Sequence, residues 1–399
     1  MKSNATSLPS ASLVCHEATK LSHETKIMNF ELSNPQQLLR ETTRSSLSKA
    51  CSKKSVRHLM ETDTAFDPEL WQTVTDQGWL ALHLPENVGG LGLGLVELAV
   101  IAEETSRACM PGPFLPTLWA ATLLAGINQP GSSSEYLNSI IEGKLKATVA
   151  LLESGTDWNA DNVQLALQKN GGGWQLTGRK TFVLDAAAAD LLLCVTQKGQ
   201  ELALVAIPRE TRGMICTACS MLDATRKLYE VEFNKVSIDN GQVLATGEPA
   251  RAALENSLQV ATLVVCAETV GAMQWVLETT VEYAKTRKQF GQIIGTFQAV
   301  QHQCADMLLQ TESARAATRF AAWALTAGEA DASKAVSIAK ACCSDLGHKV
   351  CNHGVQVHGG IGFTWEHDLH LYLKRVALCE FLFGDANQHR EKIACAILD

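Results

Sequence analysis

The chain has 399 residues, of which 46% are hydrophobic and 19% are charged. This composition supplies a large buried core, excludes disordered and fibrous proteins, and at this length predicts two or three domains. The formal net charge of -8 argues against a nucleic-acid groove or an anionic membrane as the main partner. No continuous apolar run approaches the roughly 18 residues that cross a bilayer, so we expect no membrane span.

Residues 1–29 are predicted to be a disordered extension. The first 27 residues are polar, rich in Ser and Thr, and contain Glu17 and Glu24 but no arginine. This pattern disfavours a signal or transit peptide, and Met28 offers an alternative start. We therefore expect a cytoplasmic protein.

The thirteen cysteines do not form the pattern of a disulfide framework. Several lie within apolar helical patterns, where a cysteine acts as a small hydrophobic residue. The segment 342–353 gathers three cysteines and two histidines, but no C-x-x-C pair anchors it as a zinc site. Reduced thiols and no metal site are expected.

The hydrophobic pattern changes twice along the chain. Residues 30–146 show a helical pattern, interrupted by Pro85 and the glycines of 85–95. Residues 147–246 contain short apolar segments separated by turn residues, which predicts an all-β domain. Residues 247–399 are helical again. Helices are expected over 252–287, from after Gly295 to Gly328, from Asp331 toward Gly359, and over 366–398 with a break at Gly384.

The common nucleotide-binding and hydrolase motifs are absent from the sequence. The glycines at 89–94 and at 359–362 lack the G-x-G-x-x-G spacing and do not join a strand to a helix. The chain also has no Walker A sequence and no G-x-S-x-G turn. A Rossmann dinucleotide site and a serine hydrolase are therefore excluded.

One helix end carries more polar side chains than a helix end needs. Arg287 stands where a predicted helix finishes, and there the helix dipole favours its charge. Capping alone would explain Arg287 and Lys288. The same turn, however, is crowded by Gln289, Gln292, Gln298, Gln301 and Gln303. An arginine beside amides and Phe290 suits a pyrophosphate attached to an aromatic ring system.

The segment 351–368 is the second unusual feature. Gly359, Gly360 and Gly362 allow the backbone to approach another body closely, and Gln356 offers an amide about one helical turn earlier. A single glycine would suffice to end a helix. Three glycines within four positions favour a ligand or a close contact between subunits.

Together these segments resemble the acyl-CoA dehydrogenase family over about residues 35–395. The resemblance includes GWLALHLPENVGGLGLG and AEETSRA, then WQLTGRKTFV, then R-x-Q-F-G, GTFQAVQH and QVHGGIGF. The order of these blocks is more specific than any single block. PGPF at 111–114 with FGD at 383–385 resembles a bacterial branch associated with bulky or steroid-type acyl chains.

The resemblance implies an α+β multidomain fold with an N-terminal helical domain, a middle β-barrel and a C-terminal four-helix bundle. It implies a homo- or hetero-oligomer, a dimer or a tetramer, with FAD between the middle and C-terminal domains. The implied reaction is α,β-dehydrogenation of an acyl-CoA thioester to the 2-enoyl-CoA, with an electron-transfer flavoprotein as acceptor. On matching positions Arg287, Phe290 and Gln298 carry over as FAD contacts. Those implied from the other subunit are Gln356, Gly359 and Gly360.

The sequence departs from the family at the catalytic base. The two positions at which the family places a glutamate are here Phe383 and Ala261. Asp385 follows at the same helix break and is the candidate base, although it would equally cap the next helix. Two other carboxylates are possible substitutes: Glu380, one turn before Phe383, and Glu268, ~10 Å along the helix from Ala261.

The middle region departs as well. Leu184 replaces the threonine or serine that hydrogen-bonds the flavin, and the loop at 153–157 retains Thr156 but otherwise differs. Flavin contacts from the C-terminal region are therefore better supported than those from the middle region.

Three functions remain open at this point. The first is an acyl-CoA dehydrogenase with a relocated base. The second is a partner subunit that supplies structure and adenosine contacts, while another chain provides the carboxylate. The third is an oxygen-using acyl-CoA oxidase, for which no motif in the sequence gives support.

Overall fold

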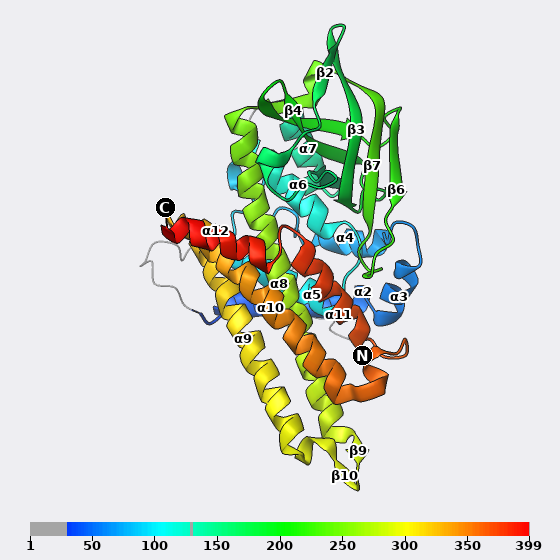
Figure 1. The fold of residues 1–399 in the computed structure, drawn as a ribbon, viewed down its shortest axis with the longest axis vertical. Coiled ribbons are helices and arrows are strands. Elements are labelled where there is room, and N and C mark those ends of the chain that lie inside the picture. Colours follow the sequence, from blue (N-terminus) through cyan, green and yellow to red (C-terminus); the bar gives the residue numbers. More distant parts are fainter. Residues whose placement is uncertain (1–29, 128–130, 399) are drawn as a thin grey trace, which may run out of the picture.

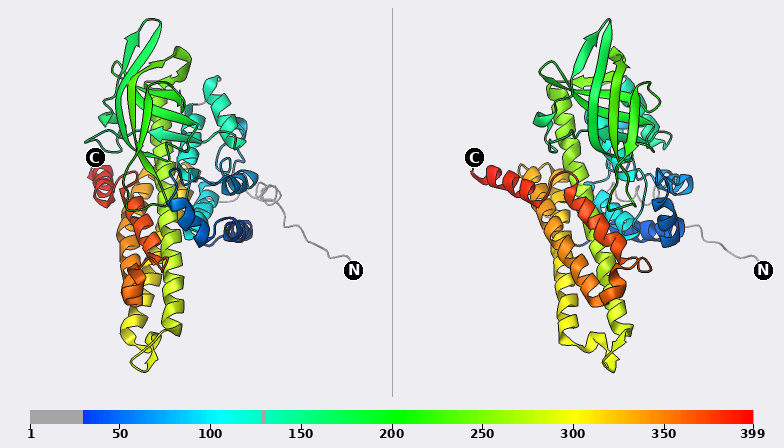
Figure 2. Two further views of the ribbon diagram at one scale, coloured as in Figure 1. Left: turned by 90° about the vertical axis from the view of Figure 1, so that its right-hand side faces the viewer. Right: turned by 45° about the vertical axis from the view of Figure 1, so that its right-hand side comes forward.

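Helices come first in the chain, then strands, then helices again (Figure 1). The computed structural model describes residues 30–127 and 131–398, so the expected extension at 1–29 lies outside the described residues. Strands β1 to β8 occupy one end of the long axis, and the short hairpin of β9 and β10 lies at the other (Figure 1). The N-terminal helices pack on one side of α8, and the later helices pack on the other (Figure 2).

The N-terminal helices begin at local capping signals. Ser33 and Gln36 form a capping box at the start of α2, and the Asp67 carboxylate accepts two main-chain N–H groups of α4. Helix α6 is buried along almost its whole length, which explains why it is apolar on every side. The bounds are α2 Asn34–Ala50, α3 Lys53–Met60, α4 Pro68–Asp76, α5 Leu95–Arg107, α6 Phe114–Ile127 and α7 Ser132–Ile141.

The middle region consists of two four-stranded sheets. In the first, the order is β1-β4-β5-β8, with β1 parallel to β4 and the other pairs antiparallel. In the second, the order is β2-β3-β7-β6, antiparallel throughout. The bounds are β1 Ala147–Ala150, β2 Leu167–Asn170, β3 Gly173–Leu184, β4 Leu191–Lys198, β5 Glu201–Pro208, β6 Met214–Ala218, β7 Leu228–Ile238 and β8 Val243–Thr246.

The two sheets do not close, so the expected β-barrel is wrong. The first sheet keeps β1 and β8 as edges, and the second keeps β2 and β6. Along β4, Leu191 and Leu193 belong to the core shared with the helices, whereas Leu192 and Cys194 belong to the core between the sheets. The first sheet is therefore buried on both faces, between helices and the second sheet. A stack of layers buries these strands without closure.

The C-terminal region consists of long helices packed around α8. The bounds are α8 Glu248–Thr286, α9 Gln298–Ala327, α10 Ala332–His358, α11 Leu369–Phe381 and α12 Ala386–Leu398. Helices α8 to α11 pack against one another, and α12 lies across α10 as a fifth helix beyond the four expected. A short hairpin, β9 Lys288–Gln289 and β10 Gln292–Ile293, connects α8 to α9. The break at Gly384 separates α11 from α12, as predicted.

Helix α8 is long and apolar enough to cross a membrane by length and composition alone. However, 89% of its most apolar 18-residue window is buried inside the protein. Helices α5, α6, α9, α10 and α11 all pack against it. Its central place in the core explains its apolar character.

Helices α5 and α8 cross so closely that the contact needs a glycine. A Cβ built on Gly271 would lie 1.9 Å from the main-chain oxygen of Glu103. We expect Gly271→Ala to lower the free energy of unfolding by about 2 kcal/mol, because a clash with the main chain costs about 3 kcal/mol, at the upper end of overpacking, and alanine regains roughly 1 kcal/mol in a helix. Thermal unfolding measures the loss.

Gly172→Ala is the matched control for this substitution. Nothing lies within 4 Å of a Cβ built at Gly172, and its φ is outside the left-handed region. Its melting temperature should stay close to that of the unaltered protein. Equal melting temperatures for the two variants would contradict the close crossing of α5 and α8.

Candidate functional site

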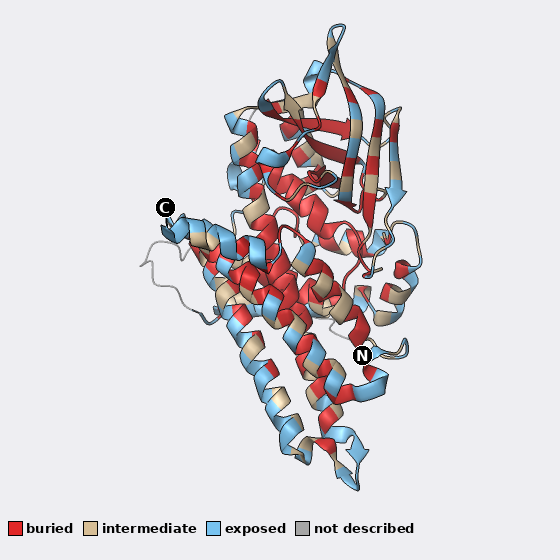
Figure 3. Ribbon diagram, in the orientation of Figure 1, coloured by how far each residue is buried: buried red, intermediate tan, exposed pale blue. Residues whose placement is uncertain are grey.

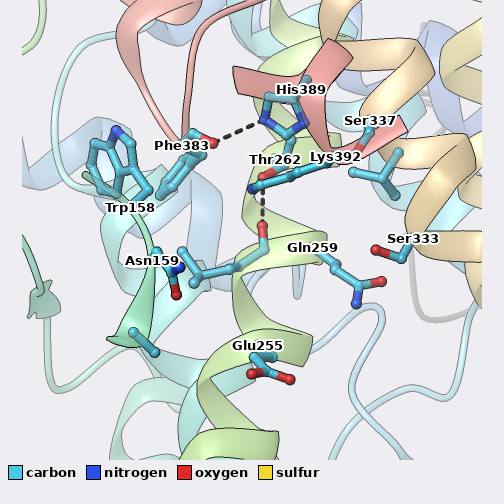
Figure 4. Close-up of a pocket in the computed structure, with 13 residues that line it drawn as sticks. Trp158, Asn159, Glu255, Gln259, Thr262, Ser333, Ser337, Phe383, His389 and Lys392 are labelled. Carbon is cyan, nitrogen blue, oxygen red and sulfur yellow. Dashed lines mark hydrogen bonds between the residues drawn. The ribbon is translucent and has the colours of Figure 1, made fainter. Parts of the chain in front are cut away.

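Two cavities lie beside the turn that joins α11 to α12. The first, which we call the strand-loop cavity, has a volume of about 390 Å³. It is bounded by residues 152–158 after β1, by the end of β3, and by the turn itself. The second, the helix cavity, has a volume of about 270 Å³ and lies between α8, α10, α12 and the same turn (Figure 4).

The expected base position is occupied by an aromatic cluster. Phe383 is only 2% exposed and packs edge-on against Trp119, with ring centroids 5.0 Å apart. It also packs against Trp158 at 4.8 Å. Ala261, at the other expected position, is fully buried. Neither position therefore offers a proton acceptor, and the space beside Phe383 is filled by indole rings.

Asp385 caps a helix. Its Oδ1 accepts the Gln388 main-chain N–H at 2.8 Å, and the Gln388 side chain accepts the Asp385 N–H at 3.1 Å. This reciprocal pair starts α12. The side chain is nevertheless exposed and lines the strand-loop cavity. The geometry thus provides the capping role directly and leaves the carboxylate within reach of a bound molecule.

The other two carboxylates are bonded to basic side chains. Glu268 receives two hydrogen bonds from the Arg226 guanidinium, at 2.7 and 2.9 Å, and both side chains are at most 4% exposed. Glu380 pairs with the His348 ring. A carboxylate fixed in a buried bidentate pair is not free to take a substrate proton.

Of the two departures in the middle region, only the loop at 153–157 lines the strand-loop cavity. Thr156 lines the strand-loop cavity, and its Oγ1 is bonded to the main chain of Glu153. Leu184 is buried away from the cavity. Phe182 lines the cavity instead; it is 39% exposed, and its φ of +52° is unusual for a residue with a side chain.

The residues expected to contact FAD belong to the end of α8, the hairpin, the start of α9 and the end of α10 with the glycines that follow it. These segments form the tip of the bundle, at the end remote from the two four-stranded sheets, and much of the hairpin at the tip is exposed (Figure 3). The expected residues are all exposed or half-buried: Arg287, Phe290, Gln298, Gln356, Gly359 and Gly360. Tyr283 stacks on His358 at 4.4 Å, which holds the end of α8 against the end of α10. One chain thus brings both expected segments to the same surface.

This surface is separated from the two cavities by the length of α11. That helix has 13 residues, about 20 Å at 1.5 Å per residue. Its N-terminal end follows the glycine segment, and its C-terminal end leads into the turn with Phe383. The expected residues therefore form two separate groups within one chain, rather than a single pocket.

Several residues at the cavities were not predicted from the sequence. Trp119 and Trp158 come from different regions and meet only in the fold. Trp158 directly follows the loop at 153–157, and Phe182 lies two residues before Leu184. The loop at 153–157 and Leu184 were therefore the sequence signals that could have pointed to Trp158 and Phe182.

The comparisons with known proteins agree with these observations. Residues 33–144 match the N-terminal domain of acyl-CoA dehydrogenase, and residues 250–398 match its C-terminal domain. An acyl-CoA dehydrogenase of Mycobacterium tuberculosis, IpdE2, is 30% identical over 340 residues, which are 85% of this chain and 90% of that protein. The chain belongs to the acyl-CoA dehydrogenase family.

Two solved structures of family members are also similar. One is the ChsE4-ChsE5 complex of Mycobacterium tuberculosis, with a TM-score of 0.84 and 27% identity over 93% of this chain and 99% of that chain. The other is a variant of the Tcur3481-Tcur3483 steroid acyl-CoA dehydrogenase, with a TM-score of 0.80 and 28% identity over 91% and 97% of the two chains. Acyl-CoA dehydrogenases are oxidoreductases with FAD as cofactor.

A buried histidine supports the turn between the cavities of this acyl-CoA dehydrogenase. His389 Nε2 donates to the main-chain oxygen of Phe383 at 3.0 Å (Figure 4). Its Nδ1 is buried and has no hydrogen-bond partner among the residues that the structure describes. Burial, and then the nearby Lys392 charge, lower the pKa of His389 from 6.5 to about 4. The ring is therefore neutral in the folded protein above that pH.

Acid should weaken the fold through His389. Because its pKa is lower in the folded than in the unfolded state, its stabilising contribution is complete above pH 6.5 and is lost as pH falls toward 4. We expect the wild type to lose up to about 3 kcal/mol more unfolding free energy between pH 7 and pH 4 than His389→Gln does. Urea unfolding at both pH values measures this difference.

His302→Gln, at an exposed position on α9, is the control. It should keep the pH dependence of the wild type. If His389→Gln also kept that dependence, His389 would not be held neutral by burial.

Proposed function

We propose that this chain acts in FAD-dependent α,β-dehydrogenation of an acyl-CoA thioester as a partner subunit. In this role it shares FAD with another acyl-CoA dehydrogenase chain, and that chain supplies the carboxylate. The observation that carries the proposal is the packing of Phe383 between Trp119 and Trp158 at the position of the base.

The packing of Phe383 is decisive because the reaction needs a base at this position. FAD, when bound, would supply the acceptor for the β-hydride, so the protein must supply a base for the α-proton. A thioester in the helix cavity would meet aromatic rings at Phe383 and Trp158. Glu255 also lines that cavity, but it lies about 9 Å along α8 from Ala261 and faces Arg251 at 3.7 Å. No base is thus placed at either family position.

The residues of the strand-loop cavity fit a flavin ring. Phe182 and Phe381 offer partly exposed aromatic faces whose ring centroids are 5.2 Å apart. Thr156 and Thr181 add hydroxyl groups at the cavity wall. These side chains would bind and orient the ring and exclude water from one of its faces.

The tip of the bundle fits the other end of the cofactor. In a pair of subunits, we assign residues of this tip to two different FAD molecules. Arg287, Phe290 and Gln298 contact one FAD. Gln356, Gly359 and Gly360 contact the FAD of the neighbouring subunit. The Arg287 guanidinium suits a pyrophosphate, and the open glycines suit a close approach of the adenosine. Because the tip is about 20 Å from the cavities of the same chain, a second chain completes each site.

A self-sufficient dehydrogenase is the alternative. The exposed Asp385 carboxylate at the strand-loop cavity favours it. In that case Asp385 would have to leave Gln388, which costs the cap of α12, about 1 kcal/mol.

The proposed substrate is supported by one of the relatives, and the proposed acceptor by the resemblance to the family. The similarity to a steroid acyl-CoA dehydrogenase supports a steroid-type acyl chain as substrate. An electron-transfer flavoprotein is the proposed acceptor. The cysteines in the described part of the chain are free thiols, which supports a reducing cytoplasmic compartment.

Purified alone and supplied with FAD, the chain should not reduce flavin. Butyryl-CoA, octanoyl-CoA or a steroid side-chain acyl-CoA, added without oxygen, should leave the visible flavin absorbance unchanged because no base is in place. Bleaching should appear after co-expression with a family chain that carries glutamate at the position matching Phe383 or Ala261.

Asp385→Asn separates the two hypotheses. If the isolated chain bleaches its flavin and Asp385→Asn abolishes the bleaching, the chain is a complete enzyme and the partner-subunit proposal is wrong. If the co-expressed complex turns over equally well with Asp385→Asn, the base belongs to the partner.

Arg287→Ala should weaken FAD binding to the assembled protein by at least about tenfold, since a charge-assisted hydrogen bond contributes roughly 1.5–3 kcal/mol. The melting temperature of the apoprotein should not change, because Arg287 is exposed. Titration of flavin fluorescence measures the affinity. Lys285→Ala, an exposed neighbour paired with Glu282, is the control, and equal affinities for the two variants would contradict the assignment.

A further inference from the structure

A buried lysine binds the turn that separates the two cavities. Lys340 on α10 is 1% exposed. Its Nζ donates to the main-chain oxygens of Cys379 at 2.9 Å, Glu380 at 2.8 Å and Gly384 at 2.7 Å. An ammonium has three donors, and all three are used on this turn.

The position of the ammonium explains why a buried charge is tolerated there. The last carbonyls of a helix lack partners within the helix and carry the negative end of its dipole. Lys340 supplies partners to two carbonyls at the end of α11 and to a third beyond the break. Burial lowers the pKa of Lys340, because removal from water disfavours the charged ammonium. The three hydrogen bonds must offset this cost.

The turn needs such an anchor because its backbone is strained. Phe383 has a φ of +63°, in the left-handed region that a bulky residue rarely adopts. Two neutral contacts also hold the turn: Trp158 Nε1 donates to Phe381 O at 3.2 Å, and His389 Nε2 donates to Phe383 O. Lys340 adds a charged donor and spans both sides of Phe383.

We propose that Lys340 is the positioning residue of this turn. It holds Phe383 in the aromatic cluster with Trp119 and Trp158, and it keeps Phe381 and Asp385 in the wall of the strand-loop cavity. The conformational part of this inference is independent of the proposed function. The further expectation, that loss of Lys340 weakens FAD binding, rests on the proposed function.

Lys340→Met tests the conformational part. Fluorine NMR of protein labelled with fluorotryptophan reports on Trp119 and Trp158, assigned by Trp119→Phe and Trp158→Phe. Release of the turn should shift or broaden both resonances at a temperature where the variant is folded. Lys340→Gln retains amide donors for the same carbonyls and should restore the wild-type positions in part.

Lys227→Met is the matched control. Lys227 is a half-buried lysine that donates to one main-chain oxygen, that of Met60, away from both cavities. Its loss should leave the two resonances in place. If Lys340→Met lowers the melting temperature but leaves both resonances at their wild-type positions, Lys340 only stabilises the fold and the inference is wrong.

The remaining outcomes are also decisive. If both Lys340 variants fail to fold while Lys227→Met folds, Lys340 determines the whole fold rather than one turn, and the inference is again wrong. If the resonances shift as expected but FAD affinity of the assembled protein is unchanged, the positioning role stands. In that case the strand-loop cavity is not the flavin site, and the failure lies in the proposed function.

Discussion

The burial of α8 is the constraint on which the rest of this protein is built. The helix has 39 residues and contacts both the N-terminal helices and the other helices of the bundle. At two points its neighbours approach to backbone distance: Gly271 against Glu103 of α5, and Ala253 against Gly126 of α6. Small residues at these crossings fix where α5 and α6 lie, and α6 in turn packs on β1. The position of the strand-loop cavity follows from this arrangement.

Buried ion pairs then orient the strands relative to the bundle. Arg226, in the loop before β7, pairs with Glu268 of α8, and Asp223 in the same loop pairs with Arg375 of α11 at 2.9 Å. Taking such groups out of water offsets much of the attraction, so the pairs contribute little net stability. Breaking one pair is costly, however, because it leaves a buried charge without a partner. The pairs therefore favour one orientation of the strands relative to the bundle. The pair with Arg226 also gives the Glu268 carboxylate a structural role.

The sequence predicted the helices better than it predicted the site. Gly328 ends α9 in a left-handed conformation, and Gly384 breaks the last helical segment, so local signals were enough for those ends. The strands were also predictable, but their closure was not, because alternation of apolar residues says which faces are buried and not which edges pair. For Asp385, the sequence left open a cap or a base. The cap is a local contact with Gln388, three residues later, whereas a role as base depends on atoms that only the fold brings together. For the cluster of Trp119 and Trp158 around Phe383, the sequence offers only the place of Trp158 after the loop at 153–157, and nothing in it indicates that Trp119 meets Trp158.

The exposed tip of the bundle carries an unusual aromatic residue, Phe290. Phe290 is 92% exposed and has a φ of +52°, so it combines an uncovered aromatic ring with a strained backbone. Each of these features costs free energy in an isolated chain. On the proposed function, both are accounted for because bound FAD would cover the ring that the strained turn presents. On the proposed function, a chain with Phe383 at the base position that keeps this surface would retain what sharing FAD between subunits requires, and not what proton removal requires.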